Sequence, residues 1–525
     1  MTSPRTDVLP LLALKIAPRQ FDLSYRFSNI SLRDQIVRGQ TLVRALLDTG
    51  LVKANAPESG NAFQLLICGA GAAGLAAAKE AAELGISFVL IEKGARAPGG
   101  VLCSTAQRYV STAMYEWPHP NCVEHAYPLA VPSLLGPDQS PMPTLPLNLG
   151  APVTVGDFGD AIDALLSRDI IDWANNFQAF VSGTPHIARR LFAANTTIQT
   201  RTKQALKAML KGKASIHGVP LHDASLPHIL LENGAIAHIP SVRVRYVIYA
   251  VGYAAETTEY AKGKVPYAGY EHKSFWEPDP IHQKNLGFTE PPHVGIVGSG
   301  DGALQDALRC LTDPVFPHAL ALWHSLLSKP ATDGGDLKDS THVMRAMAEV
   351  AAADSYTTGG AIWTSSRHIF GSLDKAFLDI IDRLFAAETL ALQRAVGSLV
   401  RSDVGSVSVI LRDGHFTKAY ALNRFLILLF HRVLADPGTL FHGRLRILTA
   451  EVADFRPLKG NVRGGRLDIV DRNGAFTTHD FDLAIIRAGL DQNTSPTQLV
   501  GLSGMDTGRA ELGRIPPSIR PIGMG

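Results

Sequence analysis

Phe63–Gly100 reads FQLLICGAGAAGLAAAKEAAELGISFVLIEKGARAPGG, and this stretch decides the fold. It opens with an apolar run at 65–68, which is typical of a buried strand. The run enters Gly69, Gly71 and Gly74 in the spacing GxGxxG, and an alanine-rich segment of helical composition follows. A strand that turns through this glycine pattern into a helix indicates a dinucleotide-binding unit.

Each small residue of this turn has a physical task. Gly69 lets the chain leave the strand sharply, and Gly71 has no side chain, so a pyrophosphate can approach the backbone. Gly74 allows the helix to pack closely on the strand. The helix begins near Ala72 and Ala73, where free N–H groups and a positive dipole end face the phosphates. We therefore expect these five residues to bind a cofactor.

A second apolar run, Ile86–Ile91, ends at Glu92. Glu92 follows Gly74 at close to the spacing of about twenty residues that is expected of a carboxylate binding ribose hydroxyls. Lys93 and the pair Gly99–Gly100 come next, and we assign them to the same site. This order of elements resembles the extended fingerprint of the two-dinucleotide-binding-domain flavoproteins, which implies FAD here. The alternative is a glycine-rich turn that binds no ligand.

The composition is that of an ordinary folded protein with a substantial core. The chain has 525 residues, of which 46% are hydrophobic and 19% charged, and this length suits about two to four domains. A net charge of +2 gives no electrostatic case for nucleic acid. None of the four cysteines forms a CxxC pair, and no metal-binding cluster is evident. No apolar run reaches about 18 residues, so we expect a cytoplasmic protein without a membrane span.

We expect the chain to be divided into three parts. Residues 1–60 should form an N-terminal helical arm, which would be a packing arm, a dimer contact, a lid or simply a cover for the core. Residues 61–270 together with 490–525 should form the FAD-binding domain. Residues 290–489 should form a second dinucleotide-binding, NAD(P)-like domain with a helical insertion at about 335–440.

An internal repeat supports two nucleotide-binding domains. At 228–238 and again at 467–478, two strand-like runs flank an Asn-Gly pair, which is the signal of a β-hairpin. An apolar strand follows each hairpin; the first ends in Ala250 and Gly252, and the second ends in Gly489. The predicted fold class is therefore α/β, with two Rossmann-like three-layer domains, β-hairpin excursions and a helical insertion in the second domain.

A second glycine-rich turn begins the later copy. Gly298, Gly300 and Ala303 repeat the dinucleotide spacing after an apolar run, and Asp301 and Gly302 lie between them. We assign these five residues to NADPH or NADH, because alanine in the third place often accompanies NADPH in flavoprotein families. The alternative is a degenerate copy that keeps the fold without binding a nucleotide.

The strand that should follow this second turn is poorly marked. Ala319–His324 is the only nearby apolar candidate, and no acid ends it, which argues mildly against NAD. His324 and Lys329 are the nearest groups that could hold a 2′-phosphate.

Between the two turns, Tyr267–Trp276 contains an aromatic residue, then Gly269, His272 and the aromatic Trp276. This order resembles the class B flavin monooxygenases, although one residue fewer separates Gly269 from His272. The resemblance in motif order covers about residues 64–490. It implies that His272 helps to hold the pyridine nucleotide, with Trp276 packed beside it, and these two are our candidate catalytic residues. An interdomain linker with ordinary packing explains them equally well.

Two-domain flavoproteins usually end with a segment that returns to the FAD, made of a strand, a Gly-Asp pair and a helix. Residues 512–525 resemble the approach to that strand, but no Asp and no helix follow. Three explanations remain open: the flavin is covered in another way, a neighbouring subunit of a homo-oligomer completes the site, or the site is altered.

We predict an FAD-dependent oxidoreductase, and in the first place an NAD(P)H-dependent monooxygenase that acts on a small molecule. The flavin carries the electrons in such an enzyme, so no catalytic triad or cysteine pair is needed. A flavin-dependent amine or amino-acid oxidase with a degenerate second nucleotide site is one alternative. A dinucleotide-binding sensor or scaffold is another. Bleaching of the flavin by NADPH or NADH, by amines only, or by neither discriminates among them.

Overall fold

The computed structural model describes most of the chain, and the fold follows from two sheets. The described residues are 11, 14–23, 32–55, 62–91, 99–115, 117–118, 126–127, 147–148, 151–169, 189–192, 243–250, 252, 259–260, 265–266, 274–360, 368–417 and 419–489. Each sheet has six strands. Within these residues no helix is long and apolar enough to cross a membrane.

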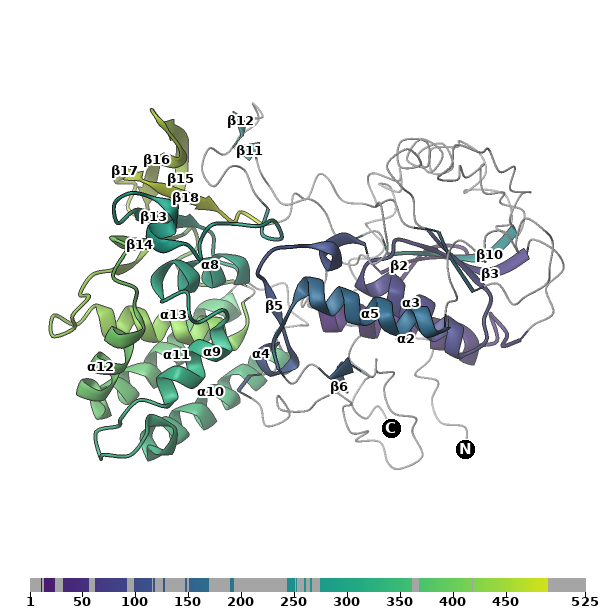
Figure 1. Ribbon diagram of the computed structural model, residues 1–525, viewed down its shortest axis with the longest axis horizontal. Helices are drawn as coiled ribbons and strands as arrows, with labels where there is room; N and C mark the ends of the chain where they lie inside the picture. Colours follow the sequence, from purple (N-terminus) through teal and green to yellow (C-terminus); the bar gives the residue numbers. More distant parts are fainter. Residues whose placement is uncertain are drawn as a thin grey trace.

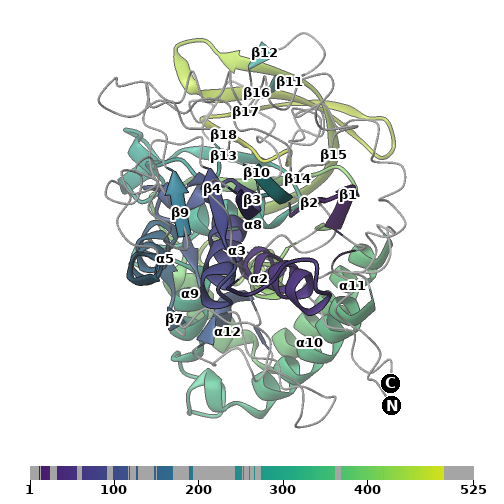
Figure 2. The same cartoon turned by 90° about the vertical axis from the view of Figure 1, so that its right-hand side faces the viewer.

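The first sheet has the strand order β1-β2-β10-β3-β4-β9. Its strands are β1 (Lys15–Ala17), β2 (Gln20–Asp22), β3 (Ala62–Cys68), β4 (Phe88–Ile91), β9 (Arg189–Phe192) and β10 (Arg243–Tyr249). All neighbouring strands are parallel except β1, which is antiparallel to β2. The helices α2 (Leu32–Asp48), α3 (Ala72–Glu83) and α5 (Val155–Asp169) lie together below this sheet in Figures 1 and 2.

The N-terminal residues contain more than the helical arm that the sequence predicts. Strands β1 and β2 join the first sheet, and all three residues of β2 are buried. A strand of three residues is too short to show the alternation by which strands are recognised in a sequence. The predicted helix is α2, and its apolar side, with Ile36, Leu42 and Leu46 fully buried, packs on α3.

The second sheet has the order β17-β16-β15-β14-β13-β18. Its strands are β13 (His293–Val297), β14 (Ser406–Leu411), β15 (Leu445–Leu458), β16 (Asn461–Asp471), β17 (Phe476–Phe481) and β18 (Leu483–Ile486). Strands β15, β14, β13 and β18 are parallel, whereas β15, β16 and β17 form an antiparallel meander. The turn at Gly474, with φ 81°, joins β16 to β17 where the Asn-Gly pair predicts a hairpin. The earlier predicted hairpin, 228–238, lies outside the described residues.

Helices cover one side of the parallel part of the second sheet. The β-meander of β15, β16 and β17 lies on the other side, as Figure 1 shows. The helices are α8 (Asp301–Leu311), α9 (Ala319–Leu327), α10 (Thr341–Gly360), α11 (His368–Ala387), α12 (Thr389–Leu399) and α13 (Ala421–Leu434). The predicted insertion at 335–440 is therefore mostly helical, but it also contains β14, a central strand of the sheet.

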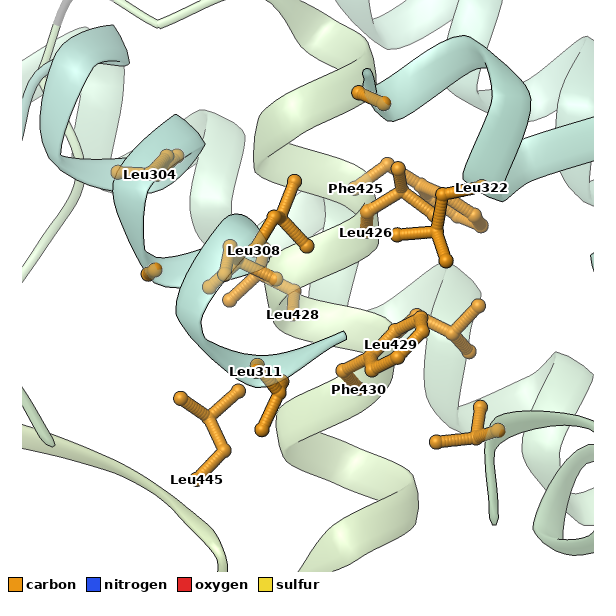
Figure 3. Packing of buried hydrophobic residues seen from close by; sticks show 14 of the residues in the cluster. Leu304, Leu308, Leu311, Leu322, Phe425, Leu426, Leu428, Leu429, Phe430 and Leu445 are labelled. Carbon is orange, nitrogen blue, oxygen red and sulfur yellow. The ribbon is translucent and has the colours of Figure 1, made fainter. Parts of the chain in front are cut away.

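The main core of the second domain lies between α8 and α13. Figure 3 shows Leu308 of α8 facing the leucines of α13, and Leu304, Leu311 and Phe425 belong to the same buried cluster. Residues of α8 recur every three or four positions on this buried side, which is the pattern of a helix packed by one face. Helix α13 is buried on nearly all sides because α8, α9, α11 and α12 surround it.

The predicted strand at Ala319–His324 is wrong, because these residues form helix α9. A short apolar run reads equally well as a strand or as a buried helix segment. The strand that follows α8 in the sheet is β14, almost a hundred residues later in the chain.

Several short elements lie outside the two six-stranded sheets, most of them between β4 and β9 and two of them between β10 and β13. They are β5 (Tyr109–Val110), α4 (Thr112–Tyr115), β6 (Ala126–Tyr127), β7 (Leu147–Asn148), β8 (Val153–Thr154), β11 (Glu259–Tyr260) and β12 (Val265–Pro266). Strand β5 pairs with β8, and the chain on either side of β5 contacts both domains.

Candidate functional site

The first glycine-rich turn lies between β3 and α3. Gly69 has φ 104°, a left-handed value that glycine adopts without strain, and Gly71 caps the helix with extended φ and ψ of −76° and −175°. No side chain caps the helix. The first N–H groups of α3, from Ala72 to Gly74, therefore remain available to an anion.

Close packing fixes the shape of this turn. A Cβ added at Gly74 would collide with the carbonyl oxygen of Gly69, and it would also lie 3.2 Å from the Cβ of Ala250. On the other side of α3, a Cβ added at Gly39 of α2 would collide with the carbonyl oxygen of Ala73. The turn is thus held by backbone contacts that only glycine permits.

The turn stands where the strand order reverses. The chain goes from β3 to β4 on one side, and β10 adjoins β3 on the other side. Ligands of open α/β sheets bind at such switch points, beyond the carboxyl ends of the strands. Ala250 and Gly252 follow β10 at this edge; the Ala250 amide donates to the Cys68 carbonyl at 2.7 Å, and Gly252 has φ 83° with open space around it.

The predicted Gly99–Gly100 pair also meets this turn. The Gly99 amide donates to the Ala70 carbonyl at 2.8 Å, and among the described residues a Cβ added at Gly71 would meet only the Gly99 oxygen, at 4.0 Å. The backbone of Gly71 is therefore accessible to a ligand. Glu92 and Lys93 lie outside the described residues.

The N-terminal strand places one more carboxylate at the same edge. Asp22 ends β2, is 1% exposed and stands in register with Tyr249, which itself stands in register with Cys68. Helix α2 comes next in the chain and packs on α3. A strand that ends in an acid and is followed by a helix is part of the pattern expected of a closing C-terminal segment, although Phe21 stands where that pattern has glycine. No sequence pattern marks Asp22, because β2 is only three residues long.

The second glycine-rich turn repeats the first one in detail. Gly298 has φ 145°, and Gly300 caps α8 with φ −91° and ψ 179°, again without a side-chain cap. Asp301, Gly302 and Ala303 form the first helical turn, as Ala72, Ala73 and Gly74 do in α3. Strands β14 and β18 flank β13, so this turn also stands at a switch point. Gly489 follows β18 with φ 90°.

Polar contacts tie the second turn to the helical insertion. The carboxylate of Asp301 accepts hydrogen bonds from the amide of Tyr420 (3.0 Å), from Nδ2 of Asn423 (2.8 Å) and from Nε2 of Gln305 (2.6 Å). Burial raises the pKa of Asp301, and these hydrogen bonds offset that effect only in part. The acid therefore anchors α13 to the start of α8.

The linker before β13 places an aromatic residue that the sequence analysis missed. Phe275 lies beside Gly302, where an added Cβ would be 3.2 Å from the ring. The ring of Trp276 meets that of Phe275 edge to face, with 4.9 Å between the ring centroids. The carbonyl of Trp276 accepts a hydrogen bond from the Ser104 hydroxyl, and its side chain packs against the hydrophobic core of the first domain. His272 lies outside the described residues. Its role, and that of Trp276, stays a prediction.

A basic residue follows the second strand of the later domain. Arg412 comes directly after β14, at the place that Glu92 occupies after β4 in the first domain. It is 59% exposed, and its Nε lies 3.4 Å from Asp413. Arg412 is not predicted from the sequence, because the apolar run Ala319–His324, after which such a residue was expected, is part of helix α9 and not the second strand.

A buried group of charges joins the two domains beneath the second turn. Arg108 contacts Asp306 of α8 (2.6 Å) and Asp279 (3.2 Å), Arg309 contacts Asp279 (2.7 Å), and Arg487 after β18 contacts Asp306 (2.8 Å). Burial alone would raise the pKa of Asp306, but the three arginines outweigh it and hold the pKa well below the usual value. The ring of Phe275 lies 3.8 Å from the Arg108 guanidinium carbon.

The fold and the two turns define a two-dinucleotide-binding-domain architecture. The comparisons with known proteins agree for the first unit, since residues 67–128 match the family model described as NAD(P)-binding Rossmann-like domain. No curated protein matches the chain in sequence.

Several solved structures share the general arrangement at low similarity. The thioredoxin reductase of T. acidophilum is 13% identical with a TM-score of 0.31, and the alignment covers 83% of this chain and 79% of that one. Cyclohexanone monooxygenase in an open form is 12% identical, with a TM-score of 0.33 and coverages of 82% and 74%. The ornithine hydroxylase of Pseudomonas aeruginosa is 13% identical, with a TM-score of 0.32 and coverages of 84% and 86%. Likenesses this remote carry no argument about the reaction.

Proposed function

We propose that the chain is an FAD-dependent oxidoreductase that accepts electrons from NADPH. One observation carries the proposal: two glycine turns with uncapped helix starts stand at the switch points of two parallel sheets in one chain. A single turn of this kind is weak evidence, but two with the same geometry match the need for a flavin and for its reductant.

FAD is assigned to the first turn. Gly69, Gly71 and Gly74 would admit its pyrophosphate, and the open backbone at Gly71 fits a phosphate at close approach. Asp22 supports the assignment, because its carboxylate ends a strand at the same edge of the sheet. When bound, the flavin supplies transfer of one or two electrons and reaction with dioxygen.

NADPH, rather than NADH, is assigned to the second turn. A carboxylate after the second strand binds the ribose hydroxyls of NAD, whereas an arginine there accommodates the 2′-phosphate of NADP. Arg412 follows β14, and its guanidinium is largely exposed. The residue type at this place therefore favours the phosphorylated cofactor.

Monooxygenation is our preferred reaction. Disulfide exchange is disfavoured because none of the four cysteines lies in a CxxC pair, although Cys103 is exposed. Cys68 and Cys310 are buried, and burial raises the pKa of both thiols, to about 12 for Cys68. Neither is a thiolate at neutral pH, and the thiolate is the form that exchanges disulfides. The substrate would be a small molecule.

The test is anaerobic reduction of the purified full chain. The flavin absorbance should bleach on addition of NADPH and, more slowly, on addition of NADH. Readmitted oxygen should then restore the oxidised spectrum, with oxygen consumed in proportion to NADPH. Released hydrogen peroxide, measured with and without candidate substrates, separates oxygenation from simple oxidation.

Three results would contradict the proposal at different levels. Failure of the purified chain to retain or take up FAD would remove the flavin assignment. Bleaching by amines but not by NADPH would support the oxidase. A bound flavin that neither reductant bleaches would leave a sensor or scaffold.

A further inference from the structure

One face of the second sheet is polar at its amino end and apolar at its carboxyl end. The face is that of the β-meander, since Phe481 of β17 fills the space above Gly295. Along β14 it carries Ser406, Ser408 and then Ile410, because side chains of one face alternate along a strand. Ile410 is 1% exposed and belongs to the small core between the two β-layers.

The neighbouring strand shows the same change. Arg446 stands in register with Ser408, and Leu448 stands in register with the buried Ile410. A central strand buried on both sides normally reads as a continuous apolar run. Serine and arginine at these central positions therefore require an explanation.

A cavity of about 380 Å³ lies over the polar half of this face. Its lining comes from the loop 440–444 before β15, from the starts of β13, β14 and β15 and from the end of β17. It lies at the amino ends of the parallel strands, so it is at the opposite edge of the sheet from the Gly298–Ala303 turn. The volume suits a small organic ligand.

The cavity has an excess of positive charge. Arg444 and Arg446 line it, and in the described part of the chain neither has a carboxylate within ion-pair distance. The lining contains one acid, Asp480, and Arg466 already holds both of its oxygens at 2.6 Å. Phe441 braces Arg444, whose guanidinium carbon lies 4.5 Å from the ring centre.

Hydrogen-bond donors accompany the two arginines. Ser408 is 4% exposed, and His293 shares a contact of 2.9 Å with the Ser406 hydroxyl. His442 and His479 also line the cavity. Among the described residues no group of three or more His, Cys, Asp or Glu side chains is placed to hold a metal ion, so these histidines do not indicate a metal site.

The rim of the cavity is apolar on one side. Leu440 is 81% exposed beside Phe441. Guanidinium and hydroxyl donors match phosphate oxygens in charge and geometry, and two arginines balance a dianion. We propose that this cavity binds a small soluble phosphate monoester, with the phosphate at Arg444, Arg446 and Ser408 and an apolar or ring portion against Leu440 and Phe441.

The experiment measures binding of phenyl phosphate to the purified full chain by isothermal titration calorimetry. Inorganic phosphate and phenol are titrated separately, because they represent the phosphate and the ring portion of the probe. Sodium chloride keeps the ionic strength constant. Phenyl phosphate should bind more tightly than inorganic phosphate, and phenol should not bind. The double variant R444Q/R446Q should weaken phenyl phosphate at least about tenfold.

The control variant is Lys459→Gln, because this exposed cation lies on the turn between β15 and β16, outside the cavity lining. It should change the affinity by less than about twofold. Equal losses in the two variants would show a general charge effect and overturn the proposal. The absence of binding in the wild type would also overturn it, and so would competition between phenyl phosphate and NADPH.

Ser408→Ala supplies a second test that changes no charge. This variant should bind phenyl phosphate more weakly than the wild type. Circular dichroism of each variant verifies that the fold is kept.

Discussion

The two glycine turns have the same backbone path but are held in place by different forces. The first is fixed by close backbone contacts, at Gly74 against Gly69 and at Gly39 against Ala73. The second has one such contact, at Gly298 against the Arg487 carbonyl, and is held in addition by polar groups, through Asp301 to α13 and through Arg487 and Asp306 to the domain junction. The third residue of the pattern reflects this difference, since Ala303 is tolerated where Gly74 is required.

The difference teaches that one motif can depend on packing in one domain and on charge in the other. Contacts between backbones do not respond to pH or salt, whereas buried ion pairs depend on the protonation of the acid. The second turn should therefore respond to pH and to charge-removing substitutions, and the first should respond to added volume.

The largest effect is expected from Asp306→Asn, which leaves Arg108 and Arg487 without their shared buried partner. We expect a loss of about 3–5 kcal/mol in the free energy of unfolding at pH 7, measured by urea denaturation. The pKa of Asp306 is held below its ordinary value, so the stabilisation is complete above the ordinary aspartate pKa of about 3.9 and is lost as the pH falls through the lower, folded-state pKa. The difference in the free energy of unfolding between wild type and variant should therefore become smaller only below about pH 4.

The control for this prediction is Asp382→Asn, which removes the partner of Arg432 in an exposed ion pair. This variant should lose no more than about 1 kcal/mol in the free energy of unfolding. A similar loss in both variants would contradict the special role of the buried group.

Gly74→Ala should break the first turn by added volume alone. The new Cβ collides with the Gly69 carbonyl, and overpacking of this kind costs about 1–3 kcal/mol. We expect a matching fall in the thermal midpoint and loss of FAD from the purified protein. The reciprocal change, Ala303→Gly, adds no volume and should cost about 1 kcal/mol through helix propensity. Equal effects would refute the contrast between the two turns.

Asp22→Asn tests whether the N-terminal strand contributes to the FAD site. A carboxylate hydrogen bond is worth about 1.5–3 kcal/mol, so we expect FAD to bind about 10- to 100-fold more weakly, measured by fluorescence titration of the apoprotein. Gln20→Glu changes charge on the same strand, away from its carboxyl end, and serves as a comparison. An unchanged FAD affinity in Asp22→Asn would remove this residue from the site.

The smallest effect is expected from Arg412→Ala, which lies on the surface. It should raise the KM for NADPH about tenfold and leave the KM for NADH within about twofold, because only the 2′-phosphate loses its partner. Steady-state oxidation of both nucleotides measures the ratio. Equal changes in the KM for NADPH and for NADH would show that Arg412 does not bind the 2′-phosphate.

The sequence predicts the parts of the fold whose signals are local. The turn at Gly69–Gly74 and its copy at Gly298–Ala303 both lie between a strand and a helix, as their spacing predicts. The hairpin at Gly474 also follows from its Asn-Gly pair. These signals succeed because glycine is needed where the backbone takes a left-handed conformation or approaches another backbone closely.

The rest depends on contacts that are distant in the sequence. Strand β14 follows α8 in the sheet but comes after four intervening helices, so Arg412 could not be matched to Glu92 by spacing. Strand β2 has three residues, and only its pairing with β10 identifies it. The network of Arg108, Asp306 and Arg487 unites three remote segments, and no local pattern predicts it.

The place of β2 in the first sheet has a consequence for the order of folding during synthesis. All six described strands of that sheet precede residue 250, and the later domain begins at β13. A closing strand at the C-terminus would delay completion of the sheet until the whole chain had been made. Because β2 lies near the N-terminus, the described pairings of the first sheet can all form while the second domain is still being translated. The nascent chain can thus pair the described strands of this sheet before synthesis ends, and unpaired strands are sites at which nascent proteins aggregate.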